Sequence, residues 1–454
     1  MPIAGKTTAE AVPNVLAPCV TRVHSSSVTT SINEDSLRIP VLSTGNGSTG
    51  SARRRVGAAL DASRPPGYRP HRLSESSHRS RASEYRRALR KLIMRETVGD
   101  VNVVRTWLAP LPNRKAWERM LNYTSFCISS AISGLFISRP DVVIATSPQL
   151  LVGLSGWWLA RCKRVPFVFE VRDLWPESLT AVGVGDDSSM LHRFLARIAG
   201  FLYAKADRIV VVTSAFQEHL VQHWRVPPRK LAVVENGVET ELFAPRQSDR
   251  NLRRELELEH KFVVSYIGTM GMAHGLDTFL EAAQDLQATA PDVFFLLVGE
   301  GADKERIASD AGSRGLKNVR FIDQQPRMNI PAYIGASDAC VVLLKRNDIF
   351  KTVIPTKMLE FMSCARPVIL AVDGQARKIL QQAHSGIAIP PEDATALANA
   401  ITLLAENLTL CHHLGQNGRR YILQKFSRGK TAAQYITVLE ELLEGTRKQR
   451  ANAA

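Results

Sequence analysis

The sequence lacks the features of several common protein classes. Its six cysteines form no CxxC pair and no histidine cluster accompanies them, so neither a zinc site nor a disulfide framework is indicated. No apolar run reaches the roughly 20 residues that a membrane-spanning helix needs. The first 30 residues also lack the continuous apolar core of a secretory signal. These absences favour a reducing compartment, and we expect the protein in the cytoplasm.

Basic charge is abundant but unevenly distributed. The 454 residues include 58 Lys and Arg against 43 Asp and Glu, a net charge of +15 that favours an acidic partner. Residues 1–83 alone hold 11 basic and 5 acidic residues together with 14 serines, and they are predicted to be a disordered tail. The basic stretch contains no nucleic-acid-binding motif, so we interpret it as a solvated segment and expect no nucleic-acid partner.

From about residue 84 the sequence alternates between apolar strands and helices. Continuous apolar strands separated by helices predict parallel sheets that are covered on both faces. Two such series, over 84–245 and 246–427, predict an α/β protein with two doubly wound Rossmann-like domains. Residues 428–450 are expected to form a helix that packs back on the first domain, and the polar stretch Pro245–Glu259 is the predicted hinge. The predicted strands are Val101–Trp107, Asp141–Thr146, Pro166–Asp173, Asp207–Thr213, Lys261–Ile267, Val293–Val298, Val319–Ile322, Ala339–Leu344 and Pro367–Val372.

Ligands of such sheets bind beyond the carboxyl ends of the strands, so we expect the chemistry there, in a cleft between the domains. Gly268 and Gly271 follow one strand, where glycines let backbone amides approach a phosphate. The spacing is neither the dinucleotide pattern nor a P-loop. Glu300 lies in a second glycine turn, and the alternative for both segments is an ordinary strand-to-helix turn.

A third segment, Pro355–Glu360, places a cation and a carboxylate in one helical turn. Thr356 is predicted to cap the helix that carries Lys357 and Glu360. Lys357 suits a phosphate because its ammonium is a compact charge, and Glu360 can accept hydrogen bonds from a ribose diol. The alternative is a salt-bridged surface turn.

The corresponding segment of the first series is Glu170–Glu177. It combines three carboxylates with Arg172 and Trp175 at a strand end, a combination suited to holding a sugar between an indole ring and acids. The candidates are therefore Arg172, Asp173, Trp175 and Glu177, together with Ser147 in the preceding strand-end turn. The alternative is a structural ion pair of Glu170 with Arg172 and a core position for Trp175.

These residues carry a resemblance to a known family. From about residue 84 to 430 the chain resembles family 4 glycosyltransferases with the GT-B fold, in the branch that includes L-fucosamine transferases of surface-polysaccharide synthesis. The resemblance rests on RPDVVIATSPQLLVGLSG, PFVFEVRDLWPESL, ADRIVVVT, VVENGVE, YIGTMGMAHGLDTFLEAA, VGEGADKERI, IPAYIGASDACVVLL and TVIPTKMLEFMSCARPVILAVDG.

The resemblance implies retaining transfer of a sugar from a nucleoside diphosphate, usually uridine, to a glycan or polyprenyl-linked acceptor, without metal or cofactor. By matching positions, Gly268 and Gly271 would line the diphosphate and Lys357 would neutralise it. Glu360 would hold the ribose, and Ile322 would lie beside the base. Asp173 and Trp175 would face the transferred sugar or the acceptor.

The sequence departs from the family at two places. Many members carry a glutamate eight positions before the residue that matches Glu360, where this chain has Thr352. The family also opens with a strand, a glycine-rich loop and a helix, and residues 1–83 have no convincing counterpart, so we expect an incomplete first domain with a bare sheet edge. A degenerate nucleotide-sugar-binding protein without turnover is therefore the alternative to an active transferase.

Peripheral contact with a membrane is a further expectation. Arg114, Lys115 and Arg119 flank the apolar helix that ends near Ile137, and lipid-linked acceptors lie at a membrane surface. A normally packed amphipathic helix is the alternative.

Overall fold

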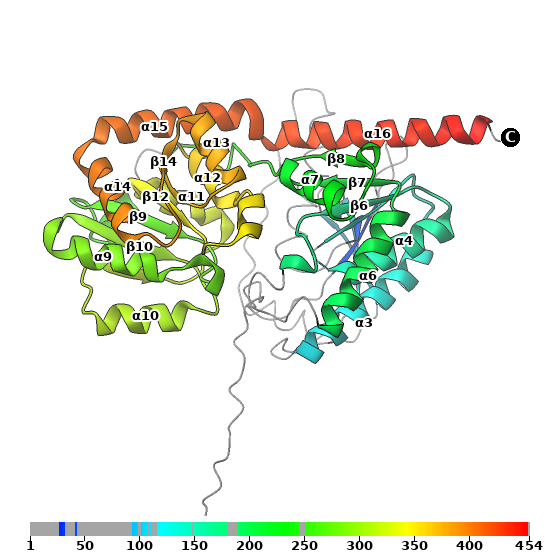
Figure 1. Cartoon of the computed structure of the whole chain (residues 1–454), viewed down its shortest axis with the longest axis horizontal. Coiled ribbons are helices and arrows are strands. Elements are labelled where there is room, and N and C mark those ends of the chain that lie inside the picture. Colours follow the sequence, from blue (N-terminus) through cyan, green and yellow to red (C-terminus); the bar gives the residue numbers. More distant parts are fainter. Residues whose placement is uncertain are drawn as a thin grey trace, which may run out of the picture.

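The computed structural model describes residues 27–31, 41–42, 93–98, 101–107, 109, 116–147, 149–178, 189–245 and 250–452. Figure 1 shows two α/β lobes side by side, with the last helix, α16 (Arg428–Asn452), extending from the second lobe along the first. Each lobe is built around a parallel sheet with helices on both faces. The predicted fold class, two doubly wound Rossmann-like domains, is confirmed.

The first domain contains a five-stranded sheet in the order β2-β5-β6-β7-β8, in which all neighbours are parallel. Alternate residues of its strands point into different cores, because a strand has a period of two. Val143 and Phe169 face the helices α3, α4 and α6, whereas Ile144 and Val168 face α16. The elements are β5 Val143–Thr146, β6 Phe167–Val171, β7 Arg208–Val211, β8 Leu231–Val233, α3 Ala116–Leu135, α4 Leu150–Lys163, α6 Met190–Lys205 and α7 Ser214–Gln222.

Two strands lie within the segment 1–83. The strand β2 (Val41–Leu42) pairs with β5 at the edge where the sequence predicts a missing strand, so this edge is covered over two residues. The strand β1 (Ser27–Ser31) belongs to a separate antiparallel sheet with β3 (Ile93–Val98) and β4 (Val101–Thr106). The strand predicted at Val101–Trp107 thus exists, but outside the parallel sheet. The prediction of disorder for the rest of residues 1–83 lies outside the described residues.

The second domain contains a six-stranded parallel sheet in the order β11-β10-β9-β12-β13-β14. The strand order reverses between β9 and β12, which is the point where ligands bind in open sheets of this kind. The elements are β9 Phe262–Ile267, β10 Val293–Val298, β11 Val319–Ile322, β12 Ala339–Leu343, β13 Val368–Ala371, β14 Gly386–Ala388, α8 Arg250–Glu255, α9 Asp277–Thr289, α10 Lys304–Ser313, α11 Ile330–Ala336, α12 Thr356–Ser363, α13 Gln375–Ala383, α14 Ala394–Glu406 and α15 Leu408–Tyr421, with short η2 Met272–His274, η3 Arg327–Asn329, η4 Asp348–Thr352 and η5 Ile422–Phe426.

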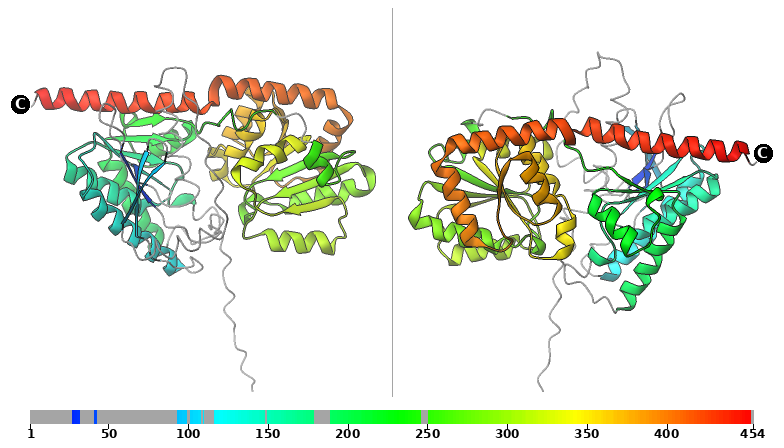
Figure 2. Two further views of the ribbon diagram at one scale, coloured as in Figure 1. Left: turned by 180° about the vertical axis from the view of Figure 1, so that it is seen from behind. Right: turned by 45° about the horizontal axis from the view of Figure 1, so that its top comes forward.

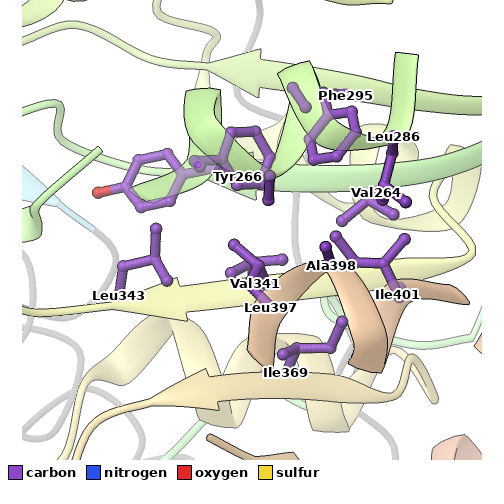
Figure 3. Close-up of a cluster of buried hydrophobic side chains, with 14 of the residues drawn as sticks. Val264, Tyr266, Leu286, Phe295, Val341, Leu343, Ile369, Leu397, Ala398 and Ile401 are labelled. Atoms are coloured by element: carbon purple, nitrogen blue, oxygen red, sulfur yellow. The ribbon is translucent and has the colours of Figure 1, made fainter. Parts of the chain in front are cut away.

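One face of this sheet packs against α9 and α14. Figure 3 shows Val264 and Tyr266 of β9 between Phe295 of β10 and Val341 of β12, with Leu397 of α14 packed on the same face of the sheet. All five side chains are fully buried. A close-packed layer of this kind fixes the ends of β9 and β12 relative to each other.

The chain crosses between the two domains twice. Val234 packs with the first sheet, whereas Val238 packs in the second domain; on the return, Phe426 still belongs to the second domain and Tyr435 of α16 to the first. The two crossings are hydrogen-bonded to each other, because Val238 N donates to Phe426 O at 2.8 Å. Figure 2 shows α16 along the first domain from two further directions.

The predicted hinge, Pro245–Glu259, is wrong for the part that the structure describes. This part contains α8, and Leu258 is buried in the core of the second domain. Arg253 also donates a hydrogen bond to Ala336 O at 2.8 Å. The polar sequence reflects an exposed helix of the second domain, and the first connection lies before it, between Val234 and Val238.

Among the described helices, none is by itself long and apolar enough to cross a membrane. The pair Ala394–Glu406 and Leu408–Phe426 reaches that length and apolarity only together, across a bend of 103°.

Candidate functional site

The loops after β9 and β10 approach each other closely through glycines. Gly268 and Gly299 have φ angles of 148° and 149°, which residues other than glycine rarely adopt. A Cβ on Gly299 would lie 2.0 Å from Gly268 O. The amides of Gly268 and Gly271 donate to Val298 O at 2.9 Å and to His274 Nδ1 at 3.3 Å. A diphosphate oxygen would therefore have to share these amides with acceptors of the protein.

Lys357, the second residue of α12, extends toward this turn. Its Nζ is buried and has no hydrogen-bond partner in the described part of the chain, although the residue as a whole is partly exposed. The Nζ lies 3.9 Å from the ring centroid of Tyr266, and a Cβ on Gly268 would lie 3.3 Å from it. Burial lowers the pKa of Lys357 to about 7. A buried cation without a partner is costly, and an anionic ligand would remove that cost.

Two aromatic residues fix the surroundings of this ammonium group. The Tyr266 hydroxyl donates to Thr269 O at 2.6 Å, which holds the ring in place under Lys357. His274 packs edge-on against Tyr266 at 5.9 Å. Burial and the nearby Lys357 lower the pKa of His274 to about 3, so this imidazole is neutral at physiological pH. Of the two basic side chains that pack against Tyr266, Lys357 is therefore the one that can carry a charge near neutral pH.

Glu360 lies one turn after Lys357 and is already ion-paired. Arg327 of η3 donates from Nη1 to Glu360 Oε1 at 3.0 Å and from Nη2 to Glu239 Oε2 at 3.1 Å. The carboxylate side chain of Glu360 is 12% exposed. Its acceptor atoms are therefore desolvated and oriented before any ligand binds.

The start of α12 differs from the prediction. Pro355 occupies the N-cap position, and no side chain caps the helix there. Thr356 is the first helical residue, so its hydroxyl is one position too late to cap the turn. The predicted capping role of Thr356 is therefore wrong, although the helix does begin where the motif places it.

The remaining candidates of the second domain have identifiable partners. Glu300 pairs with Lys304 at 2.6 Å. Ile322 is the last residue of β11 and accepts a hydrogen bond from Gly299 N at 3.0 Å through its carbonyl, which puts it at the same end of the sheet. Thr352, at the end of η4, accepts a hydrogen bond from Thr213 Oγ1 of the first domain at 2.9 Å.

In the first domain, Ser147 organises the end of β6. Its Oγ accepts hydrogen bonds from the amides of Arg172 at 2.8 Å and Asp173 at 3.3 Å. Arg172 donates to Asn236 Oδ1 at 3.3 Å. Desolvation raises the pKa of Asp173, and the charge of Arg172 opposes this only in part. The structure thus brings Ser147, Arg172 and Asp173 together.

Trp175 and Glu177 have roles inside the first domain. Trp175 is partly buried and packs against the hydrophobic core. Glu177 Oε1 accepts from Trp224 Nε1 at 3.0 Å and lies 3.2 Å from His219 Nε2. These contacts anchor α7 and the segment after it, so the Glu177 carboxylate has a structural task that the sequence motif does not reveal.

The two sets of strand-end residues belong to segments that touch across the domains. Thr213, at the end of β7, bonds to Thr352, and Ser214 lies 3.5 Å from Gln375 at the start of α13. Val353, three residues before α12, packs against the core of the first domain. The helix with Lys357 and Glu360 is therefore adjacent to the carboxyl end of the first sheet. Among the described residues, no group of three or more His, Cys, Asp or Glu is arranged to hold a metal ion.

Sequence reasoning missed Arg327, Tyr266 and His274. Arg327 lies 33 residues before Glu360, and no local pattern connects the two. Tyr266 reads as a strand residue, and only the position of Lys357 shows that its ring faces the ammonium group. Of these three residues, only His274 could have been suspected from the sequence, because it lies three residues after Gly271 in a candidate phosphate-binding turn.

Two Rossmann-like domains that touch at the carboxyl ends of their strands have the arrangement of the GT-B class. Comparison with known proteins gives the family. The chain matches the model for glycosyl transferases group 1 over residues 248–421 and the model for the glycosyl transferase 4-like domain over residues 71–237. The two matches lie in the two α/β domains, and the chain is a glycosyltransferase.

Individual relatives agree with this assignment. The chain is 26% identical over 309 residues to the probable glycosyltransferase WbjE of Pseudomonas aeruginosa, which covers 67% of this chain and 74% of the relative. It is 24% identical over 323 residues to the putative colanic acid biosynthesis glycosyl transferase WcaI of Escherichia coli, which covers 65% and 75%. The structure of Anabaena HepE in complex with UDP has a TM-score of 0.59 at 19% identity, and covers 71% of this chain and 84% of HepE.

Proposed function

We propose that this glycosyltransferase takes its sugar from a nucleoside diphosphate donor whose base is uracil. The observation that carries the proposal is the buried Nζ of Lys357, which has no partner in the described residues and lies at the switch point of the second sheet. A diphosphate would supply the missing negative charge. The UDP bound to the structurally similar HepE supports uridine as the nucleoside.

The proposed donor would be held at three places. Lys357 would contact the diphosphate, Glu360 would accept hydrogen bonds from the ribose hydroxyls, and the end of β11 at Ile322 would border the base. During transfer the nucleotide leaves as an anion, so a fixed cation stabilises the transition state more than the ground state.

We further propose that the sugar is transferred with retention of its anomeric configuration. A phosphate oxygen of the donor would take the proton of the acceptor hydroxyl, so no separate base is required. Asp173 is the candidate for orienting the acceptor or the transferred sugar. Desolvation raises the pKa of its carboxyl above the ordinary value.

For the acceptor we propose a glycan or polyprenyl-linked sugar in the synthesis of a surface polysaccharide, in the branch that resembles L-fucosamine transferases. The name of the relative WcaI, which refers to colanic acid biosynthesis, supports this role. The enzyme would act in the cytoplasm, with peripheral contact to the membrane.

An exposed apolar surface on α3 supports the membrane contact. Ile128, Ile132 and Phe136 are 56%, 52% and 70% exposed, and the first two are four residues apart on one side of the helix. The basic residues named for this contact cannot be placed beside it, because Arg114 and Lys115 lie outside the described residues and the Arg119 side chain is not described. Sedimentation with anionic vesicles tests the proposal, since Ile128→Ser/Ile132→Ser should reduce binding if this surface is used.

The donor assignment is tested by thermal unfolding with uridine and guanosine diphosphates. UDP is expected to raise the unfolding midpoint of the wild type, since a ligand at 100 times its Kd adds about 2.7 kcal/mol to stability. Glu360→Ala should lose this response, whereas Glu305→Ala, an exposed glutamate on α10, should keep it. If UDP fails to stabilise the wild type, or if Glu360→Ala responds like the wild type, the donor-site assignment is wrong.

Transfer itself is tested with radiolabelled UDP-sugars and a lipid extract. Label is expected to enter the organic phase with the wild type and to remain in the aqueous phase with Lys357→Met. Label that stays aqueous with every donor, despite UDP binding, would favour the nucleotide-sugar-binding alternative for this chain.

A further inference from the structure

Arg327 bridges two carboxylates that are distant from it and from each other in the sequence. Its guanidinium contacts Glu360 at 3.0 Å and Glu239 at 3.1 Å, and it lies 4.8 Å from the ring centroid of Phe243. The three charged side chains are 35%, 12% and 23% exposed for Arg327, Glu360 and Glu239. Charge-assisted bonds in such a partly dehydrated setting are stronger than exposed pairs.

Glu239 lies at the first crossing between the domains, directly after Val238. Glu239 also contacts the second crossing, since Arg428 Nε lies 3.5 Å from Glu239 Oε1. Arg428 also donates to Gly237 O at 3.0 Å, and its amide donates to Val238 O at 2.8 Å. The chain Glu360–Arg327–Glu239–Arg428 thus connects α12 with both crossings.

We propose that Arg327 is a positioning residue that couples occupancy of Glu360 to the relative orientation of the two domains. The inference rests on the proposed function, in which Glu360 receives the ribose hydroxyls. A carboxylate can accept about four hydrogen bonds, so the ribose adds donors without expelling Arg327. Those donors compete for the negative charge of Glu360, and Arg327 then binds Glu239 more strongly.

The strengthened pair would hold the first crossing against the second domain. The first crossing has no helix or strand, and the second turns at Ser427 into α16, so small backbone changes there rotate one domain relative to the other. The Thr213–Thr352 contact between domains lies at the same strand ends, and its geometry depends on this rotation. Binding of the nucleotide would therefore set the position of the first domain, which carries Asp173.

A simpler role for Arg327 is to orient Glu360 only. The two roles differ in what Glu239 does. Glu239→Gln keeps the Arg327–Glu360 pair and removes one negative charge from the connection. If Arg327 only orients Glu360, Glu239→Gln should not change the crossing segments. If Arg327 couples the two sites, Glu239→Gln should change them.

Hydrogen exchange of the crossing segments 234–243 and 427–431, with and without saturating UDP, decides between them. In the wild type UDP should slow exchange of these segments. In Glu239→Gln exchange should be about tenfold faster and should no longer respond to UDP, because a charge-assisted bond of the connection is lost. Calorimetry should give a UDP Kd within about threefold of wild type, since the contacts of the donor are intact.

Arg327→Gln should lose the exchange response and also bind UDP more weakly, because Glu360 loses its partner. Arg306→Gln is the matched control. Arg306 also bridges two carboxylates, Asp277 at 2.7 Å and Asp303 at 2.6 Å, but it lies on α10 of the second domain. This variant should keep the wild-type exchange response and the wild-type Kd.

Two results would overturn the coupling while the proposed function stands: UDP binds to the wild type but leaves both segments unchanged, or Glu239→Gln responds to UDP as the wild type does. Absence of UDP binding to the wild type would overturn the proposed function and the coupling together.

Discussion

The two domains share a fold but use their polar strand-end residues differently. In the first domain these residues satisfy one another, since Ser147 accepts two backbone amides and Glu177 is bound by Trp224 and lies beside His219. In the second domain the buried ammonium group of Lys357 lies against the Tyr266 ring but has no hydrogen-bond partner among the described residues. The difference teaches that the number of polar residues in a motif does not locate a ligand. A buried charged group that lacks a hydrogen-bond partner is the better indicator of a ligand site.

The sharpest test of this comparison is Lys357→Met. The variant is expected to bind UDP about 10- to 100-fold more weakly, because one charge-assisted contact is lost. Its unfolding midpoint without ligand should rise, since a desolvated cation is replaced by an apolar side chain of similar length. Calorimetry and thermal unfolding measure the two effects. A variant that is both less stable and unchanged in UDP binding would show that Lys357 is structural.

Glu177→Gln should show the opposite behaviour. Loss of the charged acceptor for Trp224 and His219 should lower the free energy of unfolding by about 1–3 kcal/mol and leave UDP affinity unchanged. Chemical denaturation and calorimetry test this pair of outcomes. A large loss of UDP affinity with little change in stability would place Glu177 in the donor site and break the comparison.

The effect of Glu177→Gln should also depend on pH. Burial raises the pKa of Glu177, but hydrogen bonds from His219 and Trp224 outweigh it, and the net pKa lies below the ordinary value. The folded state therefore favours the ionised form, and its contribution is complete above the ordinary pKa and is lost as the pH falls through the folded value. The stability difference between wild type and variant should accordingly shrink in acid.

The smallest predicted effect is proton uptake on UDP binding. The pKa of Lys357 is lowered by burial to about 7 without ligand, and a diphosphate would raise it. UDP should therefore bind the protonated form, and its affinity should fall as the pH rises above about 7, by at most about tenfold per unit. Calorimetry in buffers of different ionisation enthalpy should detect close to one proton per UDP at pH about 8.5. Uptake that persists in Lys357→Met would assign the proton to another group.

Stability of the unliganded protein should change in the opposite direction over the same range. The folded state binds fewer protons than the unfolded state between the lowered pKa of Lys357 and its ordinary value of 10.5. The contribution of this group to stability is therefore complete above the ordinary value and is lost as the pH falls toward about 7.

The sequence predicted the positions of the strands better than it predicted which strands pair. The apolar run Val293–Val298 coincides with β10, because a parallel strand that is buried on both faces must be apolar on both. The run Val101–Trp107 also forms a strand, β4, but it pairs antiparallel with β3, the strand immediately before it, and therefore lies outside the parallel sheet. Polar composition misplaced the connection between the domains because an exposed helix and a linker look alike in composition.

The candidate site, too, was predicted only where its residues are close together in the sequence. Lys357 and Glu360 were found because they share one helical turn at a strand end. Arg327 was not, because its two partners are 33 and 88 residues away. Contacts of this separation are determined by the tertiary structure and leave no local pattern.

The helix α16 has a consequence for how the protein comes into being. Tyr435 and Leu439 cover one face of the first sheet, over Ile144 and Val210, although they follow the whole second domain in the sequence. The first domain therefore emerges from the ribosome with that face uncovered and acquires its last layer only after the second domain has been made. A fragment ending near residue 245 would expose this apolar face. If the first domain is expressed alone, we expect that residues 428–452 must be joined to it.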